Sequence, residues 1–415
     1  MKLHIPPALK HFRYRYLWLG LLISVAGSQM QSAAIHWHIR TLTGEPDPLA
    51  LGGIGLARIL PVIFFSIIGG AVADNYNRRA ILFITQSILA LQALVLAILT
   101  FGGHIAIWQI YVLTAVQAAA MAFDLPARQS LVPNLVPRDV LPSAFGLNTI
   151  AFNAGAIGGP LLFGLIPEGN MGLAYLLNSI SFLAVIFALI FMGKIPQDVN
   201  KAGGINLRAM WDGVRFIFSR PLISSTMLMD FIATFFASAN TMLPIVAQDI
   251  LKVGKPGFAW LTSAQAIGSV MAGIVVSQIP KLRRQGLLFF GAVFVFGIAT
   301  ILFGLGASFA VAMITLFVIG AADAVSTVVR NTIRQLQTPD HIRGRMTSVN
   351  QIFFMGGPQL GEVEAGVAAA LFGVPFAIVS GGIGCILGMG LVAWKWPQLV
   401  TYDWHEPQPA AATVD

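Results

Sequence analysis

Charged residues and cysteine are scarce in this sequence of 415 residues. Asp, Glu, Lys and Arg together make up 10% of it, whereas an average soluble domain carries roughly a quarter. Because 56% of the residues are apolar, the chain has too little polar surface to cover a soluble globule. Its one cysteine, Cys385, excludes an internal disulfide and a cysteine-based metal cluster, and the seven histidines are scattered without ligand spacing. The sequence therefore predicts a polytopic membrane protein without a metal or cofactor.

Long apolar runs take up most of the chain. A membrane-spanning helix needs about 20 predominantly apolar residues, and twelve runs satisfy this requirement. They are Tyr16–His38, Leu49–Ala73, Ala80–Phe101, Ile105–Leu125, Leu141–Ile166, Met171–Met192, Leu222–Ala247, Phe258–Ile279, Gly286–Gly306, Phe309–Val329, Met346–Phe372 and Val374–Trp396. The 42 glycines and 22 prolines are spread through them, as is usual in packed membrane helices. We expect an all-α membrane protein with twelve transmembrane helices.

The basic residues lie almost entirely on one side of the predicted membrane. With the N-terminus inside, 21 of the 25 Lys and Arg residues fall in inner segments, and only Arg40, Lys252 and Lys255 fall in outer loops. This bias follows the positive-inside rule, so we expect a multi-pass protein with both termini in the cytoplasm. A net charge of +8 also raises the alternative of nucleic-acid binding. Charges in short turns between spans do not support it, and no nucleic-acid partner is expected.

A polar break after the sixth run divides the chain into two halves. Residues 1–193 are expected to form an N-terminal six-helix bundle and residues 221–398 a C-terminal one, joined by a cytoplasmic linker at 194–220. In the linker, apolar side chains of Ile205–Phe218 recur at helical spacing, which favours an amphipathic helix on the membrane surface over a disordered segment. The polar segment 399–415, rich in Pro and Ala, is expected to be a disordered cytoplasmic tail.

The two halves carry traces of an internal repeat. Pro137 and Asn148 are eleven residues apart, as are Pro339 and Asn350, which lie 202 residues further along the chain. Repeated halves are typical of secondary transporters, which bind substrate and coupling ions between them. We therefore expect two pseudo-symmetric bundles around a central site.

The turn after the second run reads GGAVADNYNRRAI. It resembles the signature loop of the major facilitator superfamily, Gly-x-x-x-Asp-Arg-x-x-Arg-Arg/Lys, in four residues: Gly70, Asp74, Arg78 and Arg79. Asn75 departs from the pattern, where the family usually has Arg. The resemblance implies the major facilitator fold and a cytoplasmic gate, to which Asp124 and Arg128 at the inner end of the fourth run are expected to contribute. The alternative is a basic inner turn with a helix cap.

The fifth run has small residues at regular spacing. They resemble the fifth-helix motif of the superfamily's antiporters and are Gly146, Gly155, Gly159, Pro160 and Gly164, with Phe163 in place of the usual glycine. The resemblance implies antiport, whereas the residues themselves indicate close helix packing. We expect this helix to contact the eighth one across the interface between the bundles, through Gly155 and Gly159 on one side and Ala264, Gly268 and Ala272 on the other.

The segment Phe123–Asn148 resembles one bacterial branch of the superfamily, which contains the enterobactin exporters and macrolide efflux proteins. The resemblance extends over almost the whole chain and ends before the tail. It implies a protein of the bacterial inner membrane that exports a small organic molecule, such as a siderophore, a macrolide or another drug. It does not distinguish among these substrates.

Several charged and polar residues fall inside apolar runs, where they usually face a helix interface or a water-filled path. The charged ones are Arg58, Asp230, Glu362 and Glu364, and the alternative for each is a purely structural buried pair. Equal depths predict that Arg58 pairs with Glu362 or Glu364, with Glu364 slightly favoured, and the unpaired glutamate or Asp230 would then carry the proton. Gln29 and Gln31 are expected either to line the substrate path or to bond between helices.

These features together predict a secondary transporter that exports its substrate by alternating access in exchange for protons. The sequence has no Walker-type phosphate loop, so no ATP-binding site is expected, and no Ser, His or Cys constellation suggests an enzyme. The expected partners are a small organic substrate, protons and the lipid bilayer. An importer or uniporter of the same fold is the closest alternative, followed by a membrane receptor that does not transport.

Overall fold

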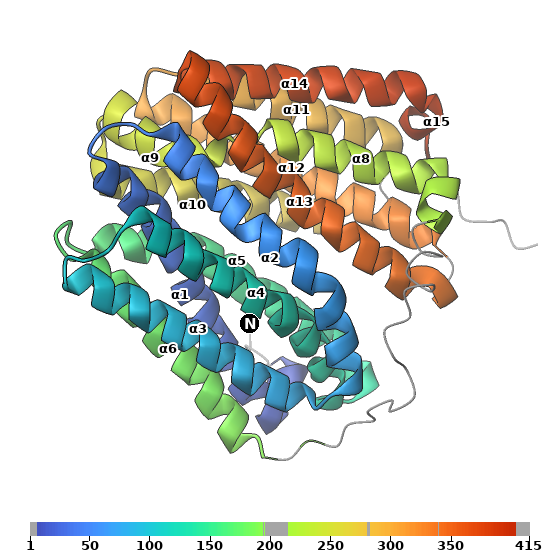
Figure 1. The fold of residues 1–415 in the computed structure, drawn as a ribbon. Helices are drawn as coiled ribbons and strands as arrows, with labels where there is room; N and C mark the ends of the chain where they lie inside the picture. The colour runs from blue at the N-terminus through green and yellow to red at the C-terminus, as the bar shows by residue number, and fades with distance from the viewer. Residues whose placement is uncertain (1–5, 194, 196–214, 280–282, 339, 404–415) are drawn as a thin grey trace, which may run out of the picture.

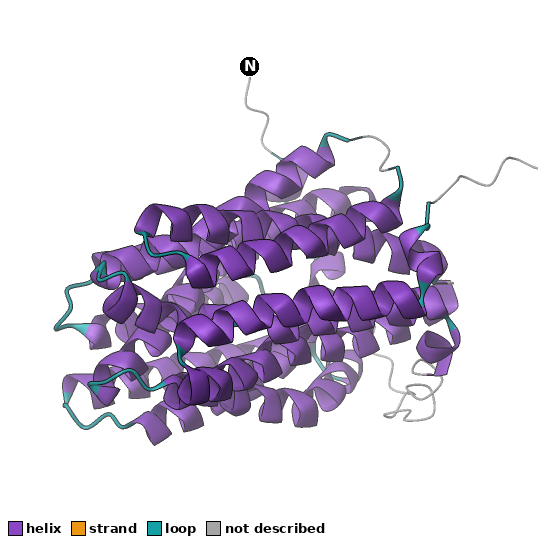
Figure 2. Cartoon of the chain, turned by 90° about the horizontal axis from the view of Figure 1, so that it is seen from above, coloured by secondary structure: helices purple, strands orange, loops and turns teal. Residues whose placement is uncertain are grey.

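The computed structural model describes residues 6–193, 195, 215–279, 283–338 and 340–403, and all regular elements in this part of the chain are helical (Figure 2). The N-terminal bundle has six long helices: α1 (Phe12–Thr43), α2 (Pro48–Asn75), α3 (Arg78–Phe101), α4 (Ile107–Leu131), α5 (Leu141–Leu165) and α6 (Met171–Phe191). Short 3-10 helices lie beside them: η1 (Pro7–Lys10), η2 (Val132–Asn134) and η3 (Arg138–Val140).

The C-terminal bundle repeats this plan (Figure 1). Its elements are α8 (Pro221–Phe236), η4 (Ala239–Met242), α9 (Leu243–Ile245), η5 (Val246–Ile250), α10 (Gly254–Ser277), α11 (Gln285–Leu305), α12 (Phe309–Gln337), α13 (Asp340–Phe372), α14 (Val374–Lys395) and α15 (Pro397–Val400). Ten segments of the described chain are long and apolar enough to span a membrane. α1 and α13, of 32 and 33 residues, are long enough to cross a membrane as well, so that each bundle has six long helices in the described chain.

The seventh span is not one continuous helix. The sequence predicts a single run over Leu222–Ala247, whereas α8 ends at Phe236 and the chain continues through η4, α9 and the π-helical turn η5. Pro244 has no backbone N–H and cannot extend an α-helical hydrogen-bond ladder. The π turn is closed by a hydrogen bond from the Leu251 amide to the Val246 carbonyl at 2.8 Å.

Polar caps fix the helix ends at the short turns. The Asp47 carboxylate accepts from the Ala50 amide at 3.0 Å and starts α2, and the Asn77 side chain accepts from the first amides of α3. Ser308 caps α12 in the same way. Such side chains satisfy amides that have no partner within the helix, so the apolar runs end where the sequence offers them.

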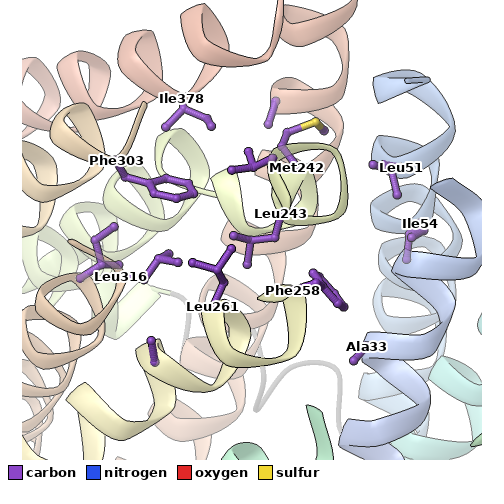
Figure 3. Close-up of a cluster of buried hydrophobic side chains, with 14 of the residues drawn as sticks. Ala33, Leu51, Ile54, Met242, Leu243, Phe258, Leu261, Phe303, Leu316 and Ile378 are labelled. Carbon is purple, nitrogen blue, oxygen red and sulfur yellow. The ribbon is translucent and has the colours of Figure 1, made fainter. Parts of the chain in front are cut away.

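The two bundles share their apolar core in one half of the molecule. We call the helix ends that are predicted to face the cytoplasm the inner ends, and the opposite ends the outer ends. The main cluster of buried side chains fills the C-terminal bundle and continues into the outer half of the N-terminal one, as Ala33 and Leu51 show beside Leu243 and Phe258 (Figure 3). The inner half of the N-terminal bundle has separate clusters.

Glycines bring α2 and α13 together at this shared core. A Cβ added to Gly52 would lie 3.0 Å from the Cα atom of Gly366, and one added to Gly55 would lie 2.2 Å from the Gln359 carbonyl oxygen. Across the other side of the molecule, a Cβ on Gly164 of α5 would lie 2.7 Å from that of Ala259 of α10. No side chain larger than hydrogen fits at these glycines without moving a helix.

The ends of the C-terminal half correct one prediction and leave another untested. The tail was expected to be disordered from Leu399, but Leu399 is fully buried and the Gly286 amide donates to the Tyr402 carbonyl at 2.8 Å. The Arg284 amide also donates to the Asp403 side chain, at 3.0 Å. Most of the predicted surface helix Ile205–Phe218 lies outside the described residues, although residues 215–219 are helical.

Candidate transport site

An ion pair closes the outer end between the bundles. Arg40, in the last turn of α1, donates through Nε to the Asp249 carboxylate at 2.7 Å, and its Nη2 contacts the second carboxylate oxygen. The same guanidinium also donates to the Gly44 carbonyl at 3.1 Å. Two parallel bonds to one carboxylate give the strong, directional form of an Arg–Asp contact. Asp249 is carried by η5, so the break in the seventh span places it there.

A lysine forms a second contact at the same end. Lys255 begins α10 and is 1% exposed, yet its Nζ donates to the Ile166 carbonyl of the other bundle. Ile166 is the residue at which α5 ends, where unbonded carbonyls attract a cation. The Lys255 ammonium also lies 4.7 Å from the centroid of the Phe163 ring, within the range of a cation–π interaction.

Aromatic rings fill the space below these charges. Trp37 of α1 lies 5.3 Å from Phe258 of α10 between ring centroids, and Phe163 meets the same ring edge-on at 6.3 Å. One turn deeper, Ser263 donates to the Ile157 carbonyl at 3.0 Å. The outer half of the interface is therefore closed by charged, aromatic and backbone contacts.

The inner halves of the helices at this interface have open space beside several glycines. Gly70 lies near the inner end of α2, Gly146 near that of α5 and Gly273 near that of α10. A Cβ added to any of the three would meet no described atom within 4 Å. Among the described residues, the close contacts across the interface therefore lie in the outer half, which is the arrangement of a transporter closed to the outside.

The predicted pairing of Arg58 is confirmed, but with the other glutamate. Arg58 Nη1 lies 3.5 Å from Glu362 Oε1, and Nη2 donates to Ser32 Oγ at 3.2 Å. The side chains are 21% and 15% exposed, and Glu362 Oε2 has no hydrogen-bond partner among the described residues. The preference for Glu364 was wrong because the glycine stripe on which it was based, Gly357–Gly361, faces α8 rather than α2.

Glu364 lies two residues further along α13 and is half-buried. No ion pair involves it within the described part of the chain. Of the three buried carboxyl groups singled out from the sequence, it is thus the one without a charged partner there.

Asp230 forms a buried ion pair inside the C-terminal bundle. Its carboxylate lies 2.8 Å from Arg330 Nη1, and the two side chains are 1% and 3% exposed. The exposed Asp323 lies 3.6 Å from the same nitrogen. The sequence assigned Arg330 only to the charges of an inner segment. The repeat offset of 202 residues aligns Arg330 with Arg128 but does not point to Asp230, because the position equivalent to Asp124 is Ser326.

The contacts that the structure describes for the predicted gate residues lie inside the N-terminal bundle. Asp124 accepts hydrogen bonds from Thr85 at 3.0 Å and Gln86 at 2.7 Å, and pairs with Arg128 one turn away. Arg78 donates to the Ser130 carbonyl and to Asn134, and Arg79 donates to the Leu189 carbonyl at 2.8 Å. The side chain of Asp74 lies outside the described residues, so its part in the gate stays a prediction.

Comparison with known proteins identifies the family to which the chain belongs. A family model described as "Transmembrane secretion effector" matches residues 6–409. The chain belongs to this family of major facilitator transporters. It is 25% identical to the staphyloferrin A transporter of Staphylococcus aureus over 87% of this chain and 90% of that one. It is 21% identical to the enterobactin exporter EntS of Escherichia coli over 97% and 96%.

Solved structures show the same fold. A POT family transporter in complex with 5-aminolevulinic acid superposes with a TM-score of 0.76 at 13% identity, covering 93% of this chain and 96% of that one. A bacterial homologue of the human lysosomal transporter Spinster, in an inward-facing and occupied conformation, gives 0.74 at 13% identity over 96% and 99%. The predicted major facilitator fold, with two bundles of six spans, is confirmed.

In this family member, the glycine that matches the signature loop does not make the close helix contact; the residue directly before it does. A Cβ added to Gly70, which matches the glycine of the signature loop, would meet no described atom within 4 Å. The neighbouring Gly69 meets α4 instead: a Cβ there would lie 2.2 Å from the Ala122 carbonyl oxygen. Gly70 lies on a side of α2 that no described residue approaches in this outward-closed state.

The fifth-helix motif packs mainly within its own bundle. α5 and α10 are neighbours as predicted, but a Cβ on Gly155 would lie 3.0 Å from the Ala26 amide of α1. One on Gly159 would lie 2.7 Å from the Met30 amide, also of α1. Only Gly164 of the motif faces α10. Gly268 likewise packs on α12, and the predicted contact of Gly155, Gly159 and Gly268 across the interface was wrong.

Gln31 forms hydrogen bonds between helices, which was the alternative to lining the substrate path. It is fully buried, donates to Gln92 at 3.2 Å and Gln117 at 3.4 Å, and accepts from Asn178 at 2.8 Å. It thereby links α1 with α3, α4 and α6. Gln29 is partly exposed, and its Cβ packs against Gly159.

Proposed function

We propose that the protein is a secondary active transporter that exports a small organic molecule in exchange for protons. It would act in a bacterial inner membrane with both termini in the cytoplasm. The substrate classes are those of its relatives and of the branch it resembles: a siderophore, a macrolide or another drug. The named relatives are an enterobactin exporter and a staphyloferrin A transporter, which favours a siderophore.

The ion pair between Arg58 and Glu362 carries this proposal. Its two members lie on α2 and α13, in different bundles, and are paired in this state, in which the outer half is closed. Any motion that opens the outer side separates these helices and therefore breaks the pair. The pair thus links the charge of one carboxyl group to the conformation of the whole transporter.

Proton exchange follows from this linkage, and we therefore propose Glu362 as the proton carrier, in place of the unpaired glutamate or Asp230 that the sequence favoured. An arginine beside a carboxyl group favours its ionised form, whereas burial without a partner favours the neutral form. In the outward-open state Glu362 loses Arg58 and takes up a proton from outside. When the outer half closes, Arg58 again favours the carboxylate, and the proton leaves toward the inside. Asp230 differs because Arg330 lies in its own bundle and stays with it throughout.

Transport in proteoliposomes under an imposed pH gradient tests the proposal. Glu362→Gln fixes the neutral form, so we expect loss of gradient-driven accumulation, while substrate still equilibrates across the membrane. Glu364→Gln is the matched control, with the same chemical change on the same helix, and should retain accumulation. Accumulation at the wild-type level by Glu362→Gln would contradict the proposal. The same assay with enterobactin, staphyloferrin A and a macrolide as competitors identifies the substrate class.

A further inference from the structure

A groove lies between the inner ends of α8 and α14. Its volume is about 420 Å³, and its lining combines apolar side chains with one cation: Leu228, Leu391, Val392, Trp394, Lys395 and Trp396. It lies in the C-terminal bundle and includes none of the residues discussed for transport.

The groove is a consequence of how α14 packs. Toward the outer end, small residues let it touch α8, and a Cβ on Gly384 or Gly388 would lie 2.6 Å from the Phe236 ring or 2.2 Å from the Ile232 side chain. Closer to the inner end, Leu391 and Trp394 replace glycine. Since large side chains prevent backbones from approaching, the two helices leave the groove between them.

The lining faces the bilayer. Leu391 is 56% exposed and Trp394 is 80% exposed, so neither is covered by the described chain. Both belong to a spanning helix, where the surrounding medium is lipid. Tryptophans are typical of the membrane interface, and the pair Trp394 and Trp396 therefore marks the level of the headgroups.

A cation stands at the inner mouth of this groove. Lys395 is the last residue of α14, and its Nζ lies 4.9 Å from the Trp396 ring centroid, which holds the ammonium beside the opening. It forms no ion pair with a described carboxylate. Basic pockets between helices on the cytoplasmic side bind acidic lipid headgroups. We propose that this groove binds one anionic phospholipid of the inner leaflet, with an acyl chain along Leu228 and Leu391 and the phosphate at Lys395.

Native mass spectrometry of the purified protein tests this site, with phosphatidylglycerol and phosphatidylcholine as probes. We expect the wild type to retain one phosphatidylglycerol in preference to phosphatidylcholine. Lys395→Gln should lower the affinity for phosphatidylglycerol by about tenfold, as for the loss of one charge contact. Leu391→Trp fills the apolar part and should weaken both lipids.

Lys10→Gln is the control, because Lys10 is an exposed cation at the inner end of the other bundle. It should leave the affinity for phosphatidylglycerol unchanged. Equal affinity of the wild type and Lys395→Gln for phosphatidylglycerol would overturn the proposal, as would equal binding of the two lipids to the wild type. Since the assay measures lipid binding alone, its result is independent of whether the protein exchanges substrate for protons.

Discussion

Arg40 and Asp249 form a bidentate ion pair that joins the last turn of α1 to the π-helical turn η5. This pair and the Lys255 contact are the outermost polar bonds between the two bundles. Both tie a charged side chain of one bundle to a group of the other, so neither survives opening of the outer side. The closed state is therefore stabilised by contacts that the transport cycle has to break, and the equilibrium between states is sensitive to each of them.

Removing the carboxylate of this pair should open the outer side. Asp249→Asn leaves Arg40, which is largely buried, without its counter-ion, and we expect the population to shift toward the outward-open state. Ser263→Cys, buried at the interface, reports this opening in a Cys385→Ser background through labelling with an impermeant maleimide from outside. The labelling rate should rise about tenfold for each ~1.4 kcal/mol of closure energy lost.

Glu45→Gln is the control for this experiment. Glu45 is an exposed outer carboxylate that forms no ion pair with a described residue, so its neutralisation should leave the labelling rate unchanged. Labelling of Asp249→Asn at the control rate would show that the ion pair does not hold the outer side closed.

Exchanging the charges of Arg58 and Glu362 tests whether their pairing matters for transport. Arg58→Glu and Glu362→Arg each place like charges together at the interface and should abolish substrate export. The double variant restores an opposite pair and should recover part of the activity. Arg58→Glu combined with Glu364→Arg is the matched control, because position 364 does not face Arg58 in the structure, and it should recover none. Equal rescue by both double variants would contradict the geometry.

The glycines of α5 should separate into two classes. Gly155→Leu and Gly159→Leu force side chains into α1 of the same bundle, so we expect loss of folded protein, measured by expression and monodispersity in detergent. Gly164→Leu meets Ala259 of the other bundle. It should leave the folded yield near that of the wild type but lower the transport rate at least several-fold, because the outer half can no longer close fully. Loss of folding by all three would show that Gly164 also belongs to the bundle core.

The spans were predictable because lipid imposes one composition on every helix that crosses it. Twelve apolar runs and a one-sided charge distribution suffice to specify two six-helix bundles. The break after Phe236 was harder to place, since an apolar run hides a change in helix type. The packed segment after Leu399 was missed because its burial depends on α11, which is far away in the sequence.

The residues of the site were easier to predict from the sequence than the residues that each of them contacts. Small residues such as Gly155 and Gly159 predict close helix packing, but they do not identify the helix against which they pack. The structure shows that this helix is α1. Glu362, rather than Glu364, pairs with Arg58 because Gly52 and Gly55 of α2 contact α13 beside Glu362. A depth estimate along each helix brings charges to the same level, but the rotation of the helix decides which of them face one another.

The buried pair of Asp230 and Arg330 permits a prediction that separates stability from coupling. Asp230→Asn leaves the nearly unexposed Arg330 with the more distant, exposed Asp323 as its described counter-ion, and losing one partner of a buried pair costs up to about 3–5 kcal/mol. We expect a clear fall in the thermal midpoint of the purified protein. Asp323→Asn is the matched control, because its side chain is 41% exposed and an exposed pair contributes only about 0–1 kcal/mol.

A second variant shows whether the protein requires the ion pair itself or only equal numbers of buried positive and negative charges. Asp230→Asn combined with Arg330→Met removes both charges and places an unbranched apolar side chain in the space of the arginine. Since the cost of one substitution is mainly that of the remaining unpaired charge, the double variant should recover most of the lost stability. It should also retain accumulation under a pH gradient if the proton is carried at Glu362. A double variant that is folded but no longer concentrates substrate would instead assign the proton to Asp230.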